Sequence, residues 1–194
     1  MNKKIILASA SPRRKNIVES MGLEFEIIPS NCEEFLEDLS FAYEKIEKLA
    51  QEKAFSVAQS IEEEVLVIGV DTVVVLDNQI LGKPEDFEEA KEMLKRLDGK
   101  THFVVTSICI INSKTKEEKL CSTTSYVEFE TLSEKMIENY VINYNPLDKA
   151  GAYGIQELPE GFVKNIQGSF ENIIGLCPLS LEKMLRDFDF VNTP

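Results

Sequence analysis

Hydroxyl and guanidinium side chains that could bind a phosphate cluster near the start of the chain. They belong to Ser9, Ser11, Arg13 and Arg14. Ser11 is typical of a helix N-cap and Pro12 of the first helical position, so both arginines are predicted in the first turn of a helix. Cations in that turn oppose the helix dipole, whereas a phosphate could accept hydrogen bonds from the free N–H groups and the guanidinium groups together. Two solvated arginines are the simpler interpretation of the pair alone, but the buried strand predicted over residues 5–8 favours an anion site.

A carboxylate stands in the middle of the most apolar run of the chain, residues 65–76. The run predicts a central strand, and a charge inside such a strand is costly unless it is paired or bound to a metal. Asp71 could form a structural ion pair with a buried arginine, but a buried carboxylate is also typical of a functional site. Thr72 follows directly, and successive side chains of a strand point to opposite faces. If both residues reach one ligand, we expect the strand to break its regular pleat near Asp71.

Five other polar residues carry weaker signals when each is taken alone. They are Glu33, Glu34, Lys53, Lys83 and Gln156. Lys53 falls on the apolar stripe of a helix predicted over residues 41–60, so its ammonium should emerge at the edge of the buried face, as in ordinary snorkelling. The glutamates suit a solvated loop, Lys83 is unremarkable by itself, and the glycine-rich segment before Gln156 could be only a turn. As a set with the arginines, they supply cations for a triphosphate, acidic groups for a divalent cation, and neutral hydrogen bonds for a base edge.

The composition narrows the classes of function. A net charge of -13 argues against nucleic acid or an anionic membrane as a partner, though not against a small anionic ligand. No signal peptide or membrane span is predicted and the four cysteines form no CxxC pair, so we expect a cytoplasmic protein with free thiols. His102 is the only histidine, and no Ser or Cys nucleophile is flanked by a base, so covalent catalysis is not expected. The reaction that uses all these groups is a metal-assisted, in-line attack of water on a phosphoanhydride.

The predicted elements alternate between strands and helices, which indicates an α/β fold with a mixed sheet in a single domain over residues 1–194. Helices are predicted over residues 12 to about 21, 41–60, 86–97 and 133 to about 141, with a last helix capped by Ser180. Strands are predicted over residues 5–8, 25–28, 65–76, 80–81, 103–111, 126–129 and 162–166. Asp86 and Glu89 predict a capping box for the third helix.

Six spaced blocks of the chain resemble the Maf family of nucleoside triphosphate pyrophosphatases. The blocks are residues 9–14, 33–34, 53–54, 71–74, 82–84 and 148–156. The resemblance implies hydrolysis of a nucleoside triphosphate to the monophosphate and pyrophosphate with a divalent metal cation, Mg or Mn. It also implies an ITPase-like fold, with a mixed twisted central sheet flanked by helices in two lobes and a cleft between them. Residues 71–73 and 151–156 resemble the branch that acts on dTTP and UTP, and modified pyrimidine triphosphates are included among the expected substrates.

The same resemblance implies roles for individual residues, and Arg14 joins them from the phosphate-binding pattern. Asp71 matches the family's proton acceptor, and we expect Lys53 and Lys83 to hold the phosphates beside it. The residues expected to bind substrate are Ser9, Arg13, Arg14, Thr72 and Gln156. Of these, Arg13, Thr72 and Gln156 match positions tied to substrate choice, and Glu34 is expected to ligate the metal.

A protein of another class would explain part of this pattern. A non-catalytic nucleotide-binding regulator linked to cell division would need the cations but not a carboxylate beside the phosphates. Asp71 therefore favours an enzyme. The expected partner is a small-molecule nucleotide, with no nucleic acid and no membrane, and the resemblance is compatible with a homodimer.

Overall fold

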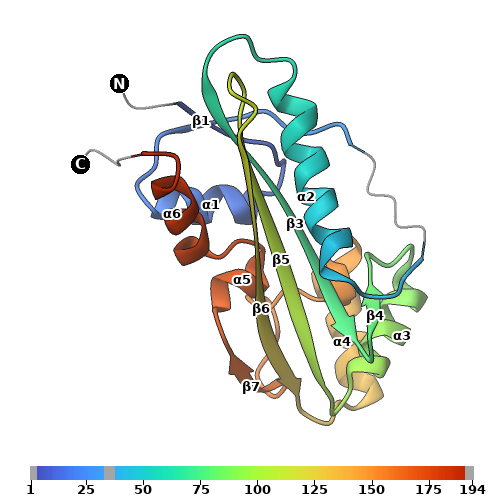
Figure 1. Cartoon of the computed structure of the whole chain (residues 1–194). Coiled ribbons are helices and arrows are strands. Elements are labelled where there is room, and N and C mark those ends of the chain that lie inside the picture. Colours follow the sequence, from blue (N-terminus) through green and yellow to red (C-terminus); the bar gives the residue numbers. More distant parts are fainter. Residues whose placement is uncertain (1–3, 33–37, 191–194) are drawn as a thin grey trace.

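The computed structural model describes residues 4–32 and 38–190, and seven strands of this part form one sheet (Figure 1). Across the sheet they lie in the order β2 (Phe25–Ile27), β1 (Lys4–Leu7), β3 (Val65–Leu76), β5 (Thr101–Asn112), β6 (Glu118–Phe129) and β7 (Val163–Gln167). A short strand, β4 (Gln79–Leu81), pairs with the end of β3. The pairs of β1 with β2 and β3 are parallel, and the other pairs are antiparallel. The predicted α/β class and mixed sheet are confirmed.

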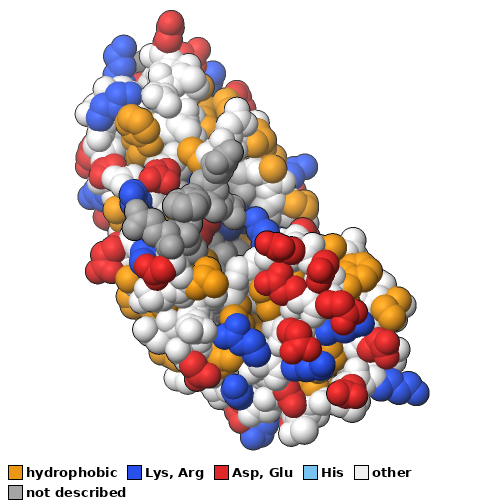
Figure 2. Space-filling model, turned by 90° about the vertical axis from the view of Figure 1, so that its right-hand side faces the viewer, with side chains coloured by type: hydrophobic (Ala, Val, Ile, Leu, Met, Phe, Trp, Pro, Cys, Tyr) orange, Lys and Arg blue, Asp and Glu red, His pale blue; other side chains and the backbone are white. Residues whose placement is uncertain are grey.

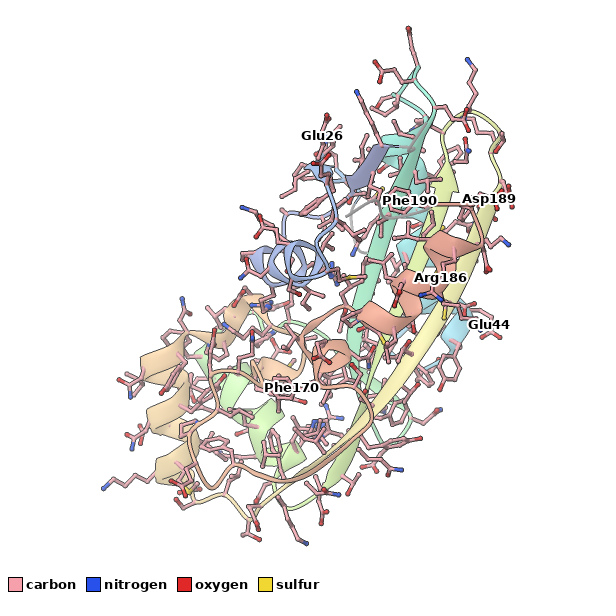
Figure 3. The ribbon with its side chains drawn as sticks, turned by 90° about the vertical axis from the view of Figure 1, so that its left-hand side faces the viewer. Glu26, Glu44, Phe170, Arg186, Asp189 and Phe190 are labelled. Carbon is pink, nitrogen blue, oxygen red and sulfur yellow. The ribbon has the colours of Figure 1, made fainter. Side chains whose placement is uncertain are left out.

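Helices cover both faces of the long strands β3 and β5. On one face lies α2 (Tyr43–Ala58), and on the other lie α1 (Pro12–Ser20), α5 (Phe170–Ile174) and α6 (Pro178–Arg186) (Figure 1). Figure 3 looks onto the second face, where Arg186 marks the end of α6 and Phe170 the start of α5. Alternate residues of β3 serve the two faces: Ile68 packs with α1 and α6, whereas Val67 packs with α2. Because both faces are covered, β3 is almost continuously apolar, as the sequence predicts.

A second group of helices packs at the other end of the same strands. There α3 (Phe87–Leu97), α4 (Glu134–Tyr144) and the 3-10 turns η1 (Pro146–Asp148) and η2 (Ala150–Ala152) enclose an apolar cluster. Leu94 of α3, Tyr140 of α4 and Phe129 of β6 are all buried in it. The long strands therefore connect two helical groups, one at each end of β3.

One edge of β3 is covered at both ends but not in its middle. β1 pairs with β3 as far as Ile68, whose carbonyl oxygen also accepts a hydrogen bond from the Ala8 N–H at 2.8 Å. β4 pairs with β3 only from Val74 to Leu76. Among the described strands, none lies beside residues 69–73 on this edge, and the polar residues Asp71 and Thr72 fall inside that gap.

Two helix starts follow the local sequence signals. The Ser11 hydroxyl caps α1 by accepting a hydrogen bond from the Arg14 N–H. Asp86 caps α3 by accepting from the Glu89 N–H, while the Glu89 carboxylate accepts from the Glu85 N–H. These caps confirm the predicted starts of both helices, because capping depends only on residues next to one another in the sequence.

Two predictions need correction, and one helix is an addition to the predicted elements. Ser180 does not cap the last helix: α6 begins at Pro178, which suits the first helical position, and the Ser180 hydroxyl instead hydrogen-bonds to Thr123 Oγ1 at 2.7 Å. β6 begins at Glu118 instead of residue 126, because its first half pairs only with β5 among the described strands and lacks a continuous apolar face. The short helix α5 was not predicted, although Ser169 caps it.

Candidate active site

A cleft of about 410 Å³ opens beside the uncovered part of β3. Its walls come from the start of α1, the middle of β3, the segment 148–157 and the end of α5. All predicted site residues that the structure describes line it: Ser9, Arg13, Arg14, Lys53, Asp71, Thr72, Lys83 and Gln156. Glu33 and Glu34 lie outside the described residues, so the role of Glu34 as a metal ligand stays a prediction.

A buried ion pair stands at the base of the cleft. The Lys53 ammonium of α2 lies 2.5 Å from Asp71 Oδ1 of β3, and the two side chains are only 7% and 6% exposed. The expectation that the Lys53 ammonium emerges into water is therefore wrong. The pairing also explains how a carboxylate is tolerated inside an apolar strand, because a lysine of the opposing helix balances the charge of Asp71. A carboxylate in this position could accept a proton from a water molecule in the cleft.

The close approach of α2 to β3 brings these two residues together. A Cβ atom on Gly69 would lie 2.2 Å from the Ala50 carbonyl oxygen and 2.5 Å from the Ala54 nitrogen. Only glycine fits there, and the small side chains of Ala50 and Ala54 allow the helix to rest directly on the strand. This contact places Lys53 over the strand two residues beyond Gly69.

The opposite face of β3 presents Thr72 to Arg14. The Arg14 guanidinium donates three hydrogen bonds: Nη2 to Thr72 Oγ1 at 3.0 Å, Nη1 to Ser9 Oγ at 3.2 Å and Nε to the Gly175 carbonyl at 3.0 Å. Thr72 Oγ1 also lies 3.0 Å from Thr106 Oγ1. Arg14 thus holds the start of α1 against β3 and the residue that follows α5, and it lines the cleft from there.

The predicted break in the pleat of β3 does not occur. The strand keeps a continuous antiparallel register with β5, from Leu66 opposite Asn112 to Val75 opposite Phe103. Asp71 and Thr72 therefore point to opposite faces, yet both line the same cleft. They do so because the edge of β3 is uncovered at this position, and a cleft at an open edge can be reached from both faces.

Arg13 crosses the cleft to the second helical group. Its Nη1 donates a hydrogen bond to Asp148 Oδ2 at 3.2 Å, and its side chain keeps an exposed fraction of 30%. Burial alone would raise the pKa of Asp148, but the hydrogen bonds and charges of Lys149 and Arg13 outweigh it and hold that pKa below its ordinary value. Asp148 is therefore a stable anion between two cations at the cleft.

The glycine-rich segment forms the opposite wall. Gly151 has a φ of +66°, and a Cβ atom on it would lie 2.9 Å from the Val74 side chain, so glycine is needed for both conformation and space. The Gly151 N–H donates to the Gly82 carbonyl at 2.9 Å, which joins this segment to the loop of Lys83. Gln156 is exposed at the end of the segment and lines the cleft.

Nearly the whole chain is similar in sequence to known proteins. A family model described as Maf-like protein matches residues 4–188. The chain belongs to the Maf family. A protein named dTTP/UTP pyrophosphatase from Thermotoga maritima is 50% identical over 180 residues, covering 92% of this chain and 85% of that protein. A protein of the same name from Clostridioides difficile is 45% identical over 188 residues, covering 97% of this chain and 96% of that protein.

One solved structure is similar over most of the chain. It is a nucleoside-triphosphatase, also described as a dITP/XTP pyrophosphatase, from Mycobacterium abscessus, with a TM-score of 0.47 and 14% identity. The match covers 95% of this chain and 93% of that one. At these values the likeness is too weak to assign a site or an activity.

This Maf protein concentrates positive charge in its cleft although its surface is acidic. Asp and Glu side chains gather on the outer surface over α3 and α4 (Figure 2). The cleft, in contrast, is lined by five basic residues, Arg13, Arg14, Lys53, Lys83 and Lys149, and by only three acidic ones, Asp71, Asp148 and Glu157. A cleft with excess positive charge on an otherwise acidic protein suits a small anionic ligand and not an extended polyanion such as a nucleic acid. Of the described helices, none is both long and apolar enough to cross a bilayer.

The described acidic side chains do not form a complete metal site by themselves. No group of three or more His, Cys, Asp or Glu side chains among them is arranged to hold a metal ion. Mg²⁺ usually needs only one or two carboxylates when a substrate supplies phosphate oxygens. Each described carboxylate that lines the cleft, Asp71, Asp148 and Glu157, is paired with a lysine, so a metal there would depend on the phosphate oxygens of a bound nucleotide.

Lys149, Asp148 and Tyr153 also line the cleft of this Maf protein, although none was predicted as a site residue. The signal available was their place in the block of residues 148–156, since no periodicity marks them. Tyr153 is buried, and its hydroxyl lies 2.7 Å from His102 Nε2. Burial lowers the pKa of His102 to about 4, so the imidazole is neutral and supports the wall behind Tyr153.

Proposed function

We propose that this protein hydrolyses dTTP and UTP to the nucleoside monophosphate and pyrophosphate. The observation that carries the proposal is the buried ion pair of Lys53 and Asp71 at the base of a cleft lined with cations. The names of the two relatives given above support the same reaction. A pure binding site for a triphosphate would need the cations but would gain nothing from a carboxylate beside them.

Asp71 acts as the general base in this proposal. It takes a proton from a water molecule whose oxygen forms a bond to the α-phosphorus of the nucleotide. The bond from that phosphorus to the bridging oxygen breaks, and pyrophosphate leaves with the electron pair. Lys53 orients the Asp71 carboxylate for this step, because its ammonium lies 2.5 Å from Oδ1.

The phosphates are held by cations from both sides of the cleft. Arg13 at the start of α1 and Lys83 in the loop after β4 line it with side chains that are at least partly accessible. Arg14 instead fixes the geometry of Ser9 and Thr72 through its guanidinium. A divalent cation, Mg²⁺ or Mn²⁺, would be held by the phosphates, with Glu34 as its predicted protein ligand, and would neutralise charge on them.

Gln156 and Thr72 select the base in this proposal. The side-chain amide of Gln156 can donate and accept, which matches the acceptor–donor–acceptor edge of uracil and thymine. Cytosine presents a different order of donors and acceptors, and purines are larger. Gln156 is exposed in the free protein, and a wrong base that covered its amide without pairing with it would cost about 1–3 kcal/mol, which corresponds to roughly ten- to a hundredfold discrimination between bases.

The test measures pyrophosphate release from dTTP, UTP, CTP, ATP and GTP with Mg²⁺. We expect dTTP and UTP to be preferred, and Asp71→Asn to lower the rate by about 10²–10⁴-fold while nucleotide still binds. Asp77→Asn is the matched control, because Asp77 is an exposed carboxylate in the turn after the same strand. Binding without pyrophosphate release in the unmodified protein would instead support the non-catalytic regulator. Activity of Asp71→Asn within a few-fold of the unmodified protein would remove Asp71 from the mechanism.

A further inference from the structure

Lys149 is a second buried lysine of the cleft, and the proposed reaction leaves it without a role. Its side chain is 8% exposed, and Nζ lies 2.8 Å from Asp148 Oδ1 and 3.3 Å from Glu157 Oε2. A buried ammonium is costly unless it is paired in good geometry. These two carboxylates therefore determine where the ammonium lies.

The two carboxylates stand at opposite ends of the segment that carries Gln156. Asp148 directly precedes Lys149, and Glu157 directly follows Gln156. By contacting both, Lys149 closes residues 148–157 into a loop. A hydrogen bond from the Glu157 N–H to the Gly154 carbonyl at 2.9 Å closes a tight turn that contains Gln156. The backbone at Gln156 is thus held by contacts of the residues around it.

The lysine stem is packed inside this loop. A Cβ atom on Gly154 would lie 3.0 Å from Lys149 Cε and 3.2 Å from Glu157 Oε2. The Gly154 N–H in turn donates to Tyr140 Oη of α4 at 3.0 Å. The stem, the glycine and the carboxylate therefore form one packed unit behind Gln156, anchored to the second helical group.

The same ion pairs continue across the cleft. Asp148 contacts Lys149 through Oδ1 and accepts from Arg13 Nη1 through Oδ2 at 3.2 Å. A chain of charges thus runs from Glu157, beside Gln156, through Lys149 and Asp148 to Arg13 of α1. Displacement of the lysine charge would loosen the Gln156 end of this chain first, because Asp148 keeps Arg13 as a partner.

We propose that Lys149 is a positioning residue that sets base selectivity by holding Gln156 against the cleft. This inference rests on the proposed function, in which Gln156 reads the edge of uracil or thymine. Lys149 acts through the loop of residues 148–157 and takes no part in the attack on phosphorus. Its loss should change which nucleotide is preferred more than how fast a bound nucleotide reacts.

The test compares Lys149→Met, which keeps the stem over Gly154 and removes the charge, with Gln156→Ala. We measure kcat and KM for dTTP and CTP. In both variants the ratio of kcat/KM for dTTP to that for CTP should fall about tenfold or more, mainly through a higher KM for dTTP. In the double variant this ratio should fall no further than in Gln156→Ala alone, because both changes remove the same contact. Lys164→Met, at an exposed lysine 2.7 Å from Glu128, is the matched control and should leave the ratio unchanged.

The outcomes separate this inference from the proposed function. The role of Lys149 alone is overturned if Gln156→Ala loses the preference for dTTP while Lys149→Met keeps the ratio unchanged. It is also overturned if Lys149→Met lowers kcat/KM equally for both nucleotides. An unchanged ratio in Gln156→Ala overturns base reading itself. If Lys149→Met does not fold, Glu157→Gln replaces it, since that side chain is 41% exposed. Glu157→Gln should lower the ratio in the same direction, and an unchanged ratio there overturns the inference.

Discussion

The buried pair of Lys53 and Asp71 predicts that stability and activity can be separated by mutation. Lys53→Met leaves a carboxylate without this partner, and Asp71→Val leaves an ammonium without it, at side chains that are 7% and 6% exposed. Removing one member of a buried ion pair typically costs about 3–5 kcal/mol. We expect the lower end, because water from the cleft can reach the remaining charge. For a chain of this size that loss lowers Tm by roughly 6–12 °C.

The double variant should recover stability without recovering activity. With Lys53→Met and Asp71→Val combined, neither charge of the buried pair remains, and two apolar side chains of suitable volume take their place. Replacement of a whole buried pair in this way is often neutral or stabilising, so we expect unfolding free energy within about 1 kcal/mol of the unmodified protein. Urea unfolding measures that free energy. Pyrophosphate release from dTTP should stay at least about 10²-fold below the unmodified rate, because the general base is still missing.

An exposed ion pair of similar length provides the control for this cycle. Lys164 Nζ lies 2.7 Å from Glu128 Oε1, but the two side chains are 56% and 32% exposed. Exposed pairs contribute about 0–1 kcal/mol, so the same cycle there should give a small coupling free energy. If the coupling free energy between Lys53 and Asp71 is no larger than this, burial does not strengthen the contribution of the pair to stability. Hydrolysis restored in the double variant would refute the assignment of Asp71 as the base.

Three further changes test other parts of the structure. Arg13→Lys should lower kcat/KM almost as much as Arg13→Ala, since an ammonium lacks the planar fork that binds phosphate, and a fully active lysine variant would contradict phosphate binding. Gly69→Ala should destabilise the protein by about 1–3 kcal/mol or more, because its Cβ would meet α2 backbone at 2.2 Å, whereas thermal melts of Gly82→Ala, with open space around it, should change little. Burial lowers the pKa of His102 to about 4, so the unfolded chain binds a proton below about pH 6.5 that the folded chain does not. Stability should therefore fall by up to about 3 kcal/mol as pH drops from 6.5 to 4, with less pH dependence in His102→Phe, and the single imidazole NMR resonance reports the pKa directly.

Local sequence signals were sufficient for the elements that depend on near neighbours. The caps at Ser11 and Asp86 and the whole extent of β3 follow from residues adjacent in the chain or from one apolar run. Ser180 shows the limit of such signals. It has the right residue type for a cap, but Pro178 two positions earlier already begins the helix, and the hydroxyl finds a partner on β6. A cap residue therefore marks a helix start only when nothing earlier can begin the helix.

The partners of the site residues could not be predicted from local patterns, because they come from distant parts of the chain. The sequence places Lys53 on the apolar stripe of its helix, which suggested a side chain that reaches water. Its actual partner, Asp71, is 18 residues away, and the two meet only because Gly69 lets α2 rest on β3. Arg14 and Gly175 are separated by 161 residues, so their hydrogen bond has no local signal at all. The sequence therefore indicates which residues belong to the site, but it does not indicate which residues they contact.

The gap in the sheet explains how two adjacent strand residues can serve one ligand. The expected break in the pleat followed from the opposite directions of successive side chains in a regular strand. β3 is covered by β1 before the gap and by β4 after it. A nucleotide lying along the open edge would meet Asp71 with Lys53 on one face and Thr72 with Arg14 on the other, while β3 keeps its full pairing with β5. The regular pleat therefore does not oppose the proposed function, because it holds Asp71, the proposed general base, and the Thr72 hydroxyl, proposed to select the nucleobase, at a fixed spacing on either side of the same edge.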